Sequence, residues 1–211
     1  MGSRVVKALD QVSLEINQGE LIIIKGPSGS GKTTMLNIMG GLDSPTSGIV
    51  YFNGQKLNSF SDKKLTKIRR ENISFIFQSF GLIQSLTAFE NVEVPLRIRH
   101  ESWKKRRDKA YEFLDIVGLK ERADHRIFEL SGGEQQRVGI ARALVTNPSV
   151  ILADEPTGEV DYLTGRKIME LFQDMVAENN VTICVATHDP GAMDFGDRSF
   201  EIKDGQIINK R

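Results

Sequence analysis

The most specific chemical signal in the sequence lies at residues 26–34, which read Gly26, Pro27, Ser28, Gly29, Ser30, Gly31, Lys32, Thr33 and Thr34. The first eight match the pattern G-x-x-x-x-G-K-[ST]. Glycines let backbone N–H groups close around phosphate oxygens, and a helix beginning at Lys32 adds partial positive charge. Lys32 can reach the β- and γ-phosphates of a nucleotide, and the Thr33 hydroxyl suits Mg²⁺. The sequence therefore predicts a phosphate-binding loop.

Residues 150–155 form an apolar run that ends in two adjacent acids, Asp154 and Glu155. A triphosphate bound with Mg²⁺ needs a carboxylate to hold the metal and a group that orients or deprotonates the attacking water. Adjacent side chains at a strand end point to opposite sides, so the two acids can divide these roles. We expect Asp154 to serve the metal and Glu155 the water. Acids also end strands because the chain meets solvent there, but the phosphate loop favours the catalytic interpretation.

Two further polar residues follow apolar runs. Gln78 comes after 73–77, and His188 comes after 181–187. Taken alone, each has a simpler interpretation as a solvated residue at the end of a strand. The 181–187 strand should end on the same sheet edge as the phosphate loop, where an imidazole could contact a γ-phosphate.

The stretch LSGGEQQR at 130–137 combines a helix start with two glycines. Ser131 and Glu134 form S-x-x-E, a capping box for the helix that follows. Gly132 and Gly133 are not needed for that box, and glycine in a first turn costs about 1 kcal/mol against alanine. The glycines indicate a close approach of the backbone to another group, and a phosphate at the helix N-terminus fits.

These residues need elements that position them, and the apolar patterns predict a mainly parallel α/β sheet with antiparallel additions. Strands are predicted at 12–16, 21–25, 73–77, 150–154 and 181–187. Helices are predicted at 32–40, 102–117, 134–146 and about 163–178. Hairpins are expected at 48–57, turning at Asn53-Gly54, and near the C-terminus, turning at Asp204-Gly205.

Composition excludes several classes of protein. The 211 residues, 39% of them hydrophobic, are enough for one globular domain with a sizeable core. The formal net charge is zero, which argues against a nucleic-acid binder. No apolar run approaches the roughly 20 residues of a membrane helix, and no apolar signal-peptide core is expected. The single cysteine, Cys184, lies in an apolar run and is predicted to be a small buried hydrophobic residue.

A basic cluster surrounds Trp103 and comprises Arg97, Arg99, Lys104, Lys105, Arg106, Arg107 and Lys109. Its simplest interpretation is a solvated helix face. The alternative is contact with anionic lipid headgroups or with an acidic loop of a membrane partner. Nucleic-acid binding is disfavoured because Trp103 is the only aromatic residue interleaved with the charges.

Taken in order, the motifs resemble the nucleotide-binding domain of an ABC transporter. The set comprises 26–34, Gln78, LSGGE at 130–134, 150–155, Asp161 and His188, and it covers essentially the whole chain. The sequence segments 40–48, 86–96 and 154–158 are similar to those of the lipoprotein-release, macrolide-efflux and FtsE-like division group.

The resemblance implies an α/β fold. It has a P-loop NTPase (RecA-like) core with a mainly parallel sheet, an antiparallel β subdomain and a helical subdomain. Residues 1–211 would form a single ABC ATPase domain. The core and the antiparallel β region would span 1–78 and 148–211, and a helical subdomain at 79–147 would carry LSGGE.

The same resemblance implies an ATPase that uses ATP and Mg²⁺ and pairs head to tail around two ATP molecules. Residues 26–34 would hold one ATP, and the metal would be served by Thr33, Gln78 and Asp154. Glu155 would polarise the attacking water, with His188 sensing the γ-phosphate and Gln78 assisting. The ATP of the other domain would be contacted by Ser131, Gly132, Gly133 and Glu134. Asp161 would belong to the loop at the interface.

The implied partners are a second copy, or a similar domain, and an integral membrane permease that contacts residues near 78–100. The implied activity is export or extraction of lipoprotein or lipid, at the cytoplasmic face of the cell membrane, without nucleic acid. One alternative is a mechanotransmission ATPase that regulates cell-wall hydrolysis through a membrane partner. A soluble ABC ATPase is disfavoured because the chain has neither long coiled coils nor a second copy of the motifs. Glu155 and His188 disfavour a nucleotide switch without hydrolysis.

Two positions depart from the family pattern. The family places an aromatic residue that stacks on adenine shortly before 7–9, where this chain has Arg4, Val5 and Val6. The family often has Asn-Leu-Asp where this chain has Glu159, Val160 and Asp161. We expect the additional carboxylate of Glu159 to weaken dimer closure by repelling phosphate.

Overall fold

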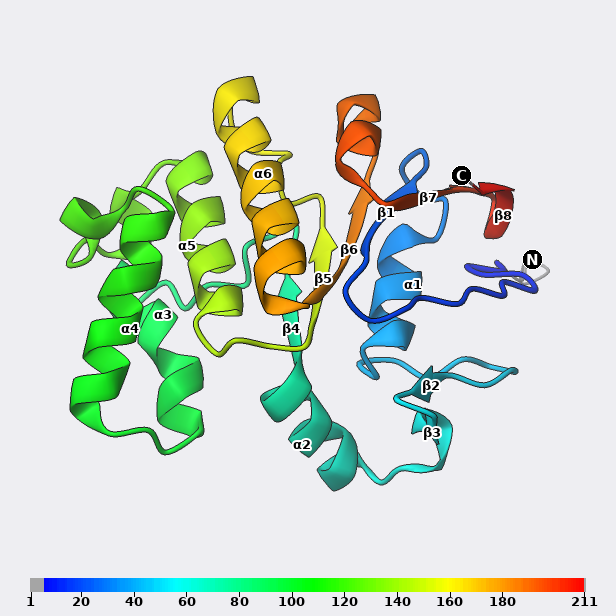
Figure 1. The fold of residues 1–211 in the computed structure, drawn as a ribbon, viewed down its shortest axis with the longest axis horizontal. Coiled ribbons are helices and arrows are strands. Elements are labelled where there is room, and N and C mark those ends of the chain that lie inside the picture. The colour runs from blue at the N-terminus through cyan, green and yellow to red at the C-terminus, as the bar shows by residue number, and fades with distance from the viewer. Residues whose placement is uncertain (1–5, 211) are drawn as a thin grey trace, which may run out of the picture.

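The computed structural model describes residues 6–210, which fold around a six-stranded sheet (Figure 1). The strand order is β4 (Ile73–Ile76), β5 (Val150–Asp154), β6 (Thr182–Thr187), β1 (Leu21–Lys25), β7 (Arg198–Lys203) and β8 (Gln206–Lys210). Each neighbouring pair from β4 to β7 is parallel, and β8 joins β7 antiparallel. A separate hairpin pairs β2 (Tyr51–Phe52) with β3 (Gln55–Lys56). The parallel sheet and both hairpins lie where the sequence predicted them.

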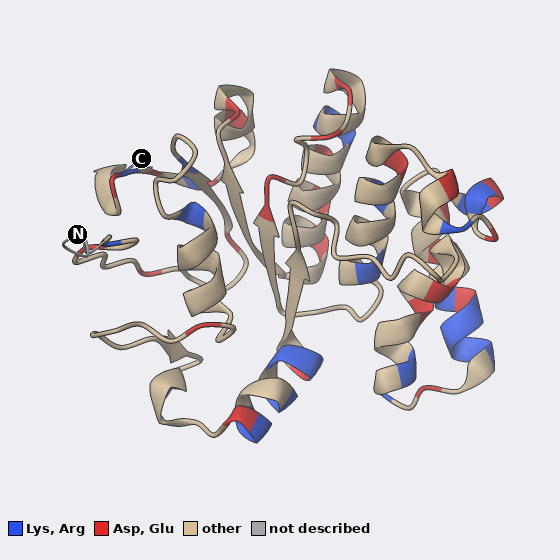
Figure 2. Cartoon of the chain, turned by 180° about the vertical axis from the view of Figure 1, so that it is seen from behind, with Lys and Arg blue, Asp and Glu red and all other residues tan. Residues whose placement is uncertain are grey.

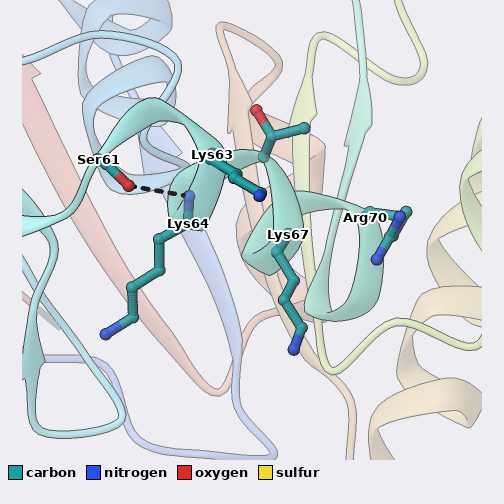
Figure 3. Close-up of a pocket in the computed structure, with 6 residues that line it drawn as sticks. Ser61, Lys63, Lys64, Lys67 and Arg70 are labelled. Atoms are coloured by element: carbon teal, nitrogen blue, oxygen red, sulfur yellow. Dashed lines mark hydrogen bonds between the residues drawn. The ribbon is translucent and has the colours of Figure 1, made fainter.

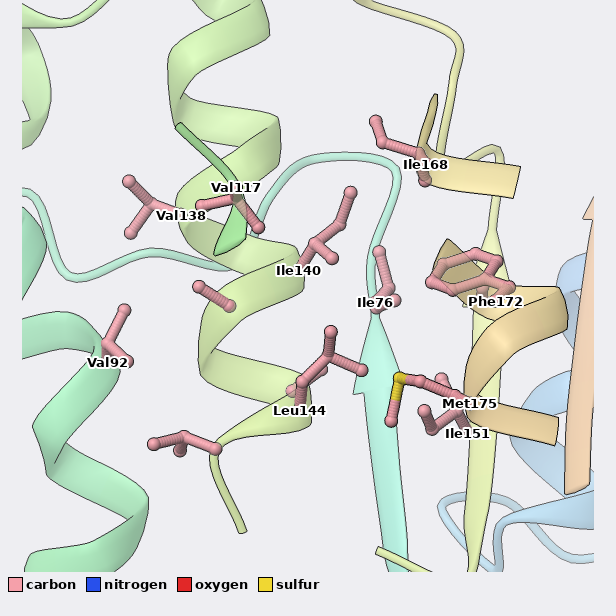
Figure 4. Packing of buried hydrophobic residues seen from close by; sticks show 14 of the residues in the cluster. Ile76, Val92, Val117, Val138, Ile140, Leu144, Ile151, Ile168, Phe172 and Met175 are labelled. Atoms are coloured by element: carbon pink, nitrogen blue, oxygen red, sulfur yellow. The ribbon is translucent and has the colours of Figure 1, made fainter. Parts of the chain in front are cut away.

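Helices cover both faces of the sheet because the central strands are apolar on both sides. One face packs against α1 (Lys32–Met39) through residues such as Ile22 and Leu152. The other face packs against α5 (Gly132–Leu144) and α6 (Tyr162–Asn179). Figure 4 shows Phe172 and Met175 of α6 beside Ile76 and Ile151 of the sheet.

Two more helices, α3 (Ala88–Ile98) and α4 (Trp103–Ile116), pack beside α5. Figure 1 shows these three helices at the β4 side of the sheet. Their apolar residues and those of the sheet form one buried cluster, which includes Val92, Leu114 and Ile151. The domain boundaries at 78 and 148 stay a prediction.

The strand predicted at 12–16 is not present. Val12, Leu14 and Ile16 are half-buried against the α1 side of the core, but the segment pairs with no strand among residues 6–210. The alternating pattern therefore predicted the burial correctly and the sheet wrongly, because burial of every second side chain does not require a ladder.

Two helices escaped sequence analysis. The first, α2 (Asp62–Asn72), has no fully buried residue, and its only apolar residues, Leu65 and Ile68, are too few to predict a helix from. The second, α3, contains Pro95, which normally signals the end of a helix. Thr87 and Glu90 form a capping box that starts α3.

Cys184 is buried, as predicted, and burial raises the pKa of its thiol to about 12. Between residues 6 and 210, no helix has both the length and the apolar character that a membrane crossing needs.

Candidate nucleotide-binding and hydrolysis site

The predicted phosphate loop connects β1 to α1 at the carboxyl edge of the parallel sheet. The amide of Gly26 donates to the carbonyl of Thr187 at the end of β6, over 3.3 Å. Gly31 has φ +106°, and an added Cβ would lie 2.3 Å from the carbonyl oxygen of Ala8. Only glycine combines this conformation with this close contact, so the backbone by itself requires glycine at position 31.

Lys32 is buried and lies over its own loop. Its Nζ donates to the carbonyl oxygens of Gly26 (2.8 Å) and Pro27 (3.1 Å). The Oε1 atom of Glu155 lies 3.7 Å from the same nitrogen. The Oγ atom of Ser30 is also buried, and it has no hydrogen-bond partner. A buried hydroxyl without a partner is costly, and a phosphate oxygen would satisfy it, so the loop fits a nucleotide.

Thr33 and Asp154 meet across the sheet edge. The Thr33 hydroxyl donates to Oδ2 of Asp154 over 2.6 Å. Burial raises the pKa of Asp154 above its ordinary value of 3.8, and the charge of Glu155 adds to the effect, against the hydrogen bond from Thr33. A cation would reverse this penalty by pairing with the carboxylate.

The two oxygen groups fit Mg²⁺ rather than a protein-caged metal. Between residues 6 and 210, no three His, Cys, Asp or Glu side chains gather to hold a metal. Mg²⁺ that is bound to nucleotide phosphates needs only one or two protein ligands and keeps several waters. Thr33 and Asp154 therefore suffice as a protein contribution.

Glu155 follows β5 in a left-handed conformation, with φ +49°. This conformation is uncommon for a residue other than glycine, and strain of this kind gathers at functional sites. The carboxylate is buried, and its Oε2 accepts from Thr187 Oγ1 (3.0 Å) and from the His188 amide (3.3 Å). The Nδ1 atom of His188 lies 3.0 Å from Oε1 of the same carboxylate. The structure thus brings together two residues that the sequence placed on separate strands.

Gln78 lies exposed in the turn after β4, and β4 pairs with β5 in parallel register. The loop that Gln78 begins is held from the helical side. The guanidinium of Arg142 on α5 donates to the carbonyl oxygens of Phe80 (3.0 Å) and Gly81 (2.5 Å). Asn91 of α3 bonds both the amide (2.8 Å) and the carbonyl (3.1 Å) of Ile83. Neither anchor could be predicted from the sequence, because both depend on contacts between distant segments.

The capping box at the start of α5 is present as predicted. Ser131 Oγ accepts from the amide of Glu134 (3.3 Å), and Glu134 accepts from the amide of Ser131 (2.8 Å). The bond from the Ser131 amide lowers the pKa of the Glu134 carboxyl, and so does a bond from the Ser131 hydroxyl to the same oxygen (2.8 Å). Arg122 lies 3.6 Å from the same carboxylate.

Gly133 makes room for the 159–160 segment of the same chain, whereas a side chain at Gly132 would meet that segment at ordinary contact distance. A Cβ added to Gly133 would lie 3.1 Å from the carbonyl oxygen of Glu159. A Cβ added to Gly132 would lie 3.8 Å from Oε2 of the Glu159 side chain. Within one chain, a close approach is present at Gly133 only, and Glu159 lies beside this helix start. The approach of a phosphate stays a prediction. Asp161 caps α6 by accepting from the amide of Thr164 over 3.0 Å.

Of the residues at the family's usual adenine-stacking position, Arg4 and Val5 lie outside the described residues. Val6 is 83% exposed.

In this chain a strand leads through a glycine-rich loop into a helix that begins Lys-Thr, and the acidic end of β5 lies beside that helix. This combination defines a P-loop NTPase. Comparison with known proteins narrows this class. A family model described as ABC transporter matches residues 9–158.

Two relatives illustrate the match. MJ0796 of Methanocaldococcus jannaschii, an uncharacterized ABC transporter ATP-binding protein, is 51% identical over 211 residues, covering 98% of this chain and 90% of its own length. The macrolide export ATP-binding/permease protein MacB of a Shewanella species is 44% identical over 208 residues, covering 99% of this chain and 32% of its own length. A dimeric structure of MJ0796 in a post-hydrolysis state, bound to ADP and Pi, matches with a TM-score of 0.96 at 48% identity, covering 100% of this chain and 93% of that chain.

The chain therefore belongs to the ABC transporter family, and it is an ATPase domain of that family with a P-loop NTPase fold. The resemblance that the motifs indicated is confirmed, including its similarity to macrolide-efflux proteins.

Proposed function

We propose that this chain hydrolyses ATP as a head-to-tail dimer, in which residues 131–134 of one copy close over the ATP held by the other. The position of α5 carries this proposal. Within one chain, α6 and the strands β5 and β6 lie between α5 and α1 in Figure 1. The N-terminus of α5 is thus far from its own phosphate loop, yet its glycines leave backbone amides open. The dimeric structures of MJ0796, a relative of this chain, support dimerisation.

Residues 26–34 would hold the triphosphate of one ATP. The Lys32 ammonium would exchange its two carbonyl partners for phosphate oxygens, and Ser30 Oγ would gain the partner that it lacks. Thr33, Asp154 and Gln78 would hold Mg²⁺, which supplies charge neutralisation on the phosphates. Asp161 would lie at the interface, because it follows Glu159 beside the start of α5.

Glu155 would act on the attacking water. Its carboxylate is held from one side by Thr187 and His188, so it is oriented before substrate arrives. A general base must lie within hydrogen-bond reach of its water and keep a fixed geometry. His188, whose side chain is 66% exposed, would turn toward the γ-phosphate and link it to Glu155.

A membrane permease would be the partner that converts hydrolysis into work, at the cytoplasmic face of the membrane. MacB, in which a similar domain occurs within an ATP-binding/permease protein, supports this proposal. Residues near 78–100 would meet the permease. The loop after Gln78 suits this role because Arg142 and Asn91 tie it to α5 and α3. Export, including extraction of lipoprotein or lipid, is the activity we propose.

Mixing two inactive variants tests the dimer. Lys32→Ala removes the phosphate contact and should abolish ATP binding, whereas Ser131→Arg should leave ATP binding by the monomer nearly intact and block hydrolysis. A dimer with one chain of each kind has one site with both halves intact. An equal mixture should therefore recover up to about a quarter of wild-type hydrolysis, as expected for random pairing in a symmetric dimer.

Hydrolysis by Ser131→Arg alone, or no recovery on mixing, would show that residues 131–134 do not act on the other chain's ATP. Unchanged nucleotide affinity in Lys32→Ala would contradict the phosphate-loop assignment. Ser59→Arg, an exposed serine far from α5 in the sequence, is the matched control and should hydrolyse ATP normally.

A further inference from the structure

Positive charge is concentrated in two segments of this neutral chain. Residues 61–71 hold five Lys or Arg against two acids, and residues 97–109 hold seven against two. These two segments, which we call the basic edge, carry an excess of eight positive charges, so the rest of the chain carries an equal negative excess. Figure 2 shows Lys and Arg on α2 and on the part of α4 nearest to it.

The two segments belong to one surface because Arg99 joins them. Its guanidinium donates to the carbonyl oxygens of Arg70 (2.8 Å) and Glu71 (3.2 Å) at the end of α2. It also donates to the carbonyl oxygen of Thr146 (2.6 Å), after α5. The turn between α3 and α4 is thereby fixed beside the end of α2.

Only some of these cations serve the fold. Arg69 donates to the carbonyl of Gly41, and Arg106 lies 2.5 Å from the buried carboxylate of Glu93, without an aligned hydrogen bond. Lys109 is half-buried, and the Nζ atom of Lys64 lies 3.4 Å from the centroid of the Phe60 ring. The exposed cations are Lys63, Lys64, Lys67, Arg70, Arg97, Lys104, Lys105 and Arg107. On α2, Lys63, Lys67 and Arg70 follow a helical spacing of four and three residues, which places them on one face. Figure 3 shows the α2 side chains extending from the helix, where they line a shallow hollow.

Two large apolar side chains are exposed at the same turn. Ile98, the last residue of α3, is 54% exposed, and Trp103, the first residue of α4, is 56% exposed. Part of the Trp103 ring packs edge-on against Phe89, with ring centroids 6.0 Å apart. A tryptophan beside lysines and arginines is typical of a surface that lies in the headgroup region of a membrane.

We infer that the basic edge binds anionic lipid headgroups directly, with Trp103 and Ile98 entering the interface. Anionic headgroups attract clusters of Lys and Arg on protein surfaces, and an apolar side chain adds affinity by leaving water. A short acidic protein segment would neutralise the cations but would offer no apolar layer to Trp103 and Ile98. The surface involves no ATP-binding residue, so it can be tested without nucleotide and independently of the proposed function.

Trp103 is the only tryptophan, so its fluorescence reports the surface directly. The whole chain without nucleotide should bind vesicles that mix phosphatidylglycerol with phosphatidylcholine, and the Trp103 emission should shift to the blue. Vesicles of phosphatidylcholine alone should bind far more weakly. The triple variant Lys63→Glu/Lys64→Glu/Lys67→Glu should bind the anionic vesicles roughly 100-fold more weakly, the loss expected when three lysines no longer meet the headgroups.

The triple variant tests binding rather than folding. Glutamates at 63 and 64 lie in the first turn of α2, where acids favour the helix, and position 67 is exposed in the next turn. None of the three lysines belongs to the ATP site, so ATP hydrolysis should be unchanged. Lys120→Glu/Lys167→Glu/Lys203→Glu changes the net charge equally at exposed positions elsewhere and should bind like the wild type. Equal binding to both kinds of vesicle, or equal loss in both triple variants, would overturn the inference. So would a poly-glutamate peptide that shifts the Trp103 emission as the vesicles do, because the surface would then serve an acidic polypeptide.

Discussion

The Nδ1 atom of His188 lies 3.0 Å from Oε1 of Glu155, while Oε2 of the same carboxylate accepts from Thr187 and from the His188 amide. Both carboxylate oxygens therefore contact residues at the end of β6. The contact explains how a residue with φ +49° keeps one orientation. It also makes the carboxylate sensitive to whatever moves the imidazole.

Glu155→Gln should trap an ATP-bound dimer. Glutamine preserves the shape and one acceptor oxygen, so ATP binding persists, but it cannot take a proton from water. We expect hydrolysis to fall roughly 100-fold or more. Size-exclusion chromatography with ATP should show a dimer where the wild type turns over and returns to monomer. Glu15→Gln, an exposed carboxylate, is the control, and an exclusively monomeric Glu155→Gln with ATP would contradict the assignment.

Asp154→Asn should stabilise the protein without nucleotide while removing Mg²⁺-dependent hydrolysis. Burial raises the pKa of Asp154 above 3.8, so the folded state holds a proton that the unfolded state releases. This proton therefore stabilises the folded state. The contribution to the free energy of unfolding is fully present below pH 3.8 and is lost as pH rises through the raised pKa. Asparagine can still accept the Thr33 hydrogen bond and carries no charge to bury.

The measurement for Asp154→Asn is the thermal midpoint without nucleotide and Mg²⁺ across the acid range. The midpoint of the variant should exceed that of the wild type increasingly as pH rises above 3.8, the ordinary pKa. Asp174→Asn, an exposed acid on α6, should leave the profile unchanged. A variant that is less stable than the wild type at neutral pH would refute the argument from burial.

The features that neighbouring residues determine were the most predictable from the sequence. The run at 21–25 is apolar on nearly every residue, and a buried parallel strand is the structure such a run favours. Ser131 and Glu134 are close in sequence, so their capping box was also predictable. The prediction of a strand at 12–16 was wrong. Alternation of apolar and polar residues indicates which side chains are buried, but pairing in a sheet also requires a neighbouring strand, which the alternation does not predict.

Long-range contacts explain the rest. In the sequence, nothing distinguishes Arg142 from other arginines on helices. Its contacts with Phe80 and Gly81, about 60 residues earlier, form only in the folded chain. The approach of Glu159 to Gly132 likewise joins two motifs that are separate in sequence. The residues of the ATP site could be named from their types and order, but their mutual orientation could not.

Arg142→Met should slow hydrolysis while leaving ATP binding nearly unchanged. Without the guanidinium, the carbonyls of Phe80 and Gly81 lose their donors, and Phe80 is held at φ +62°. We expect the loop that begins at Gln78 to lose its fixed position, and kcat to fall about 10- to 100-fold, as small misplacements of catalytic groups do. The KM for ATP should change little, because the phosphate loop is untouched.

Arg142→Lys is the conservative control, because one ammonium can still reach a carbonyl, and it should recover part of kcat. Urea denaturation should show that Arg142→Met unfolds with about 2 kcal/mol less free energy, the size of a lost charged hydrogen bond. An equal fall in both variants, or a rise in KM with kcat intact, would mean that Arg142 supports the fold and does not position the loop.

Glu159→Asn should strengthen the ATP-dependent dimer. The Glu159 carboxylate lies 3.8 Å from the point where Gly132 would carry a Cβ, at the N-terminus of α5. A negative charge there occupies the positive end of the helix that, under the proposed function, awaits a phosphate of the other chain. Removing the charge should lower the ATP concentration for half-maximal dimerisation roughly two- to fivefold, the range expected for one charge at a helix end.

The comparison is made in the Glu155→Gln background, where dimers persist, with Glu178→Gln at the far end of α6 as the matched control. An unchanged or higher ATP requirement would mean that Glu159 turns away from the phosphate when the dimer closes.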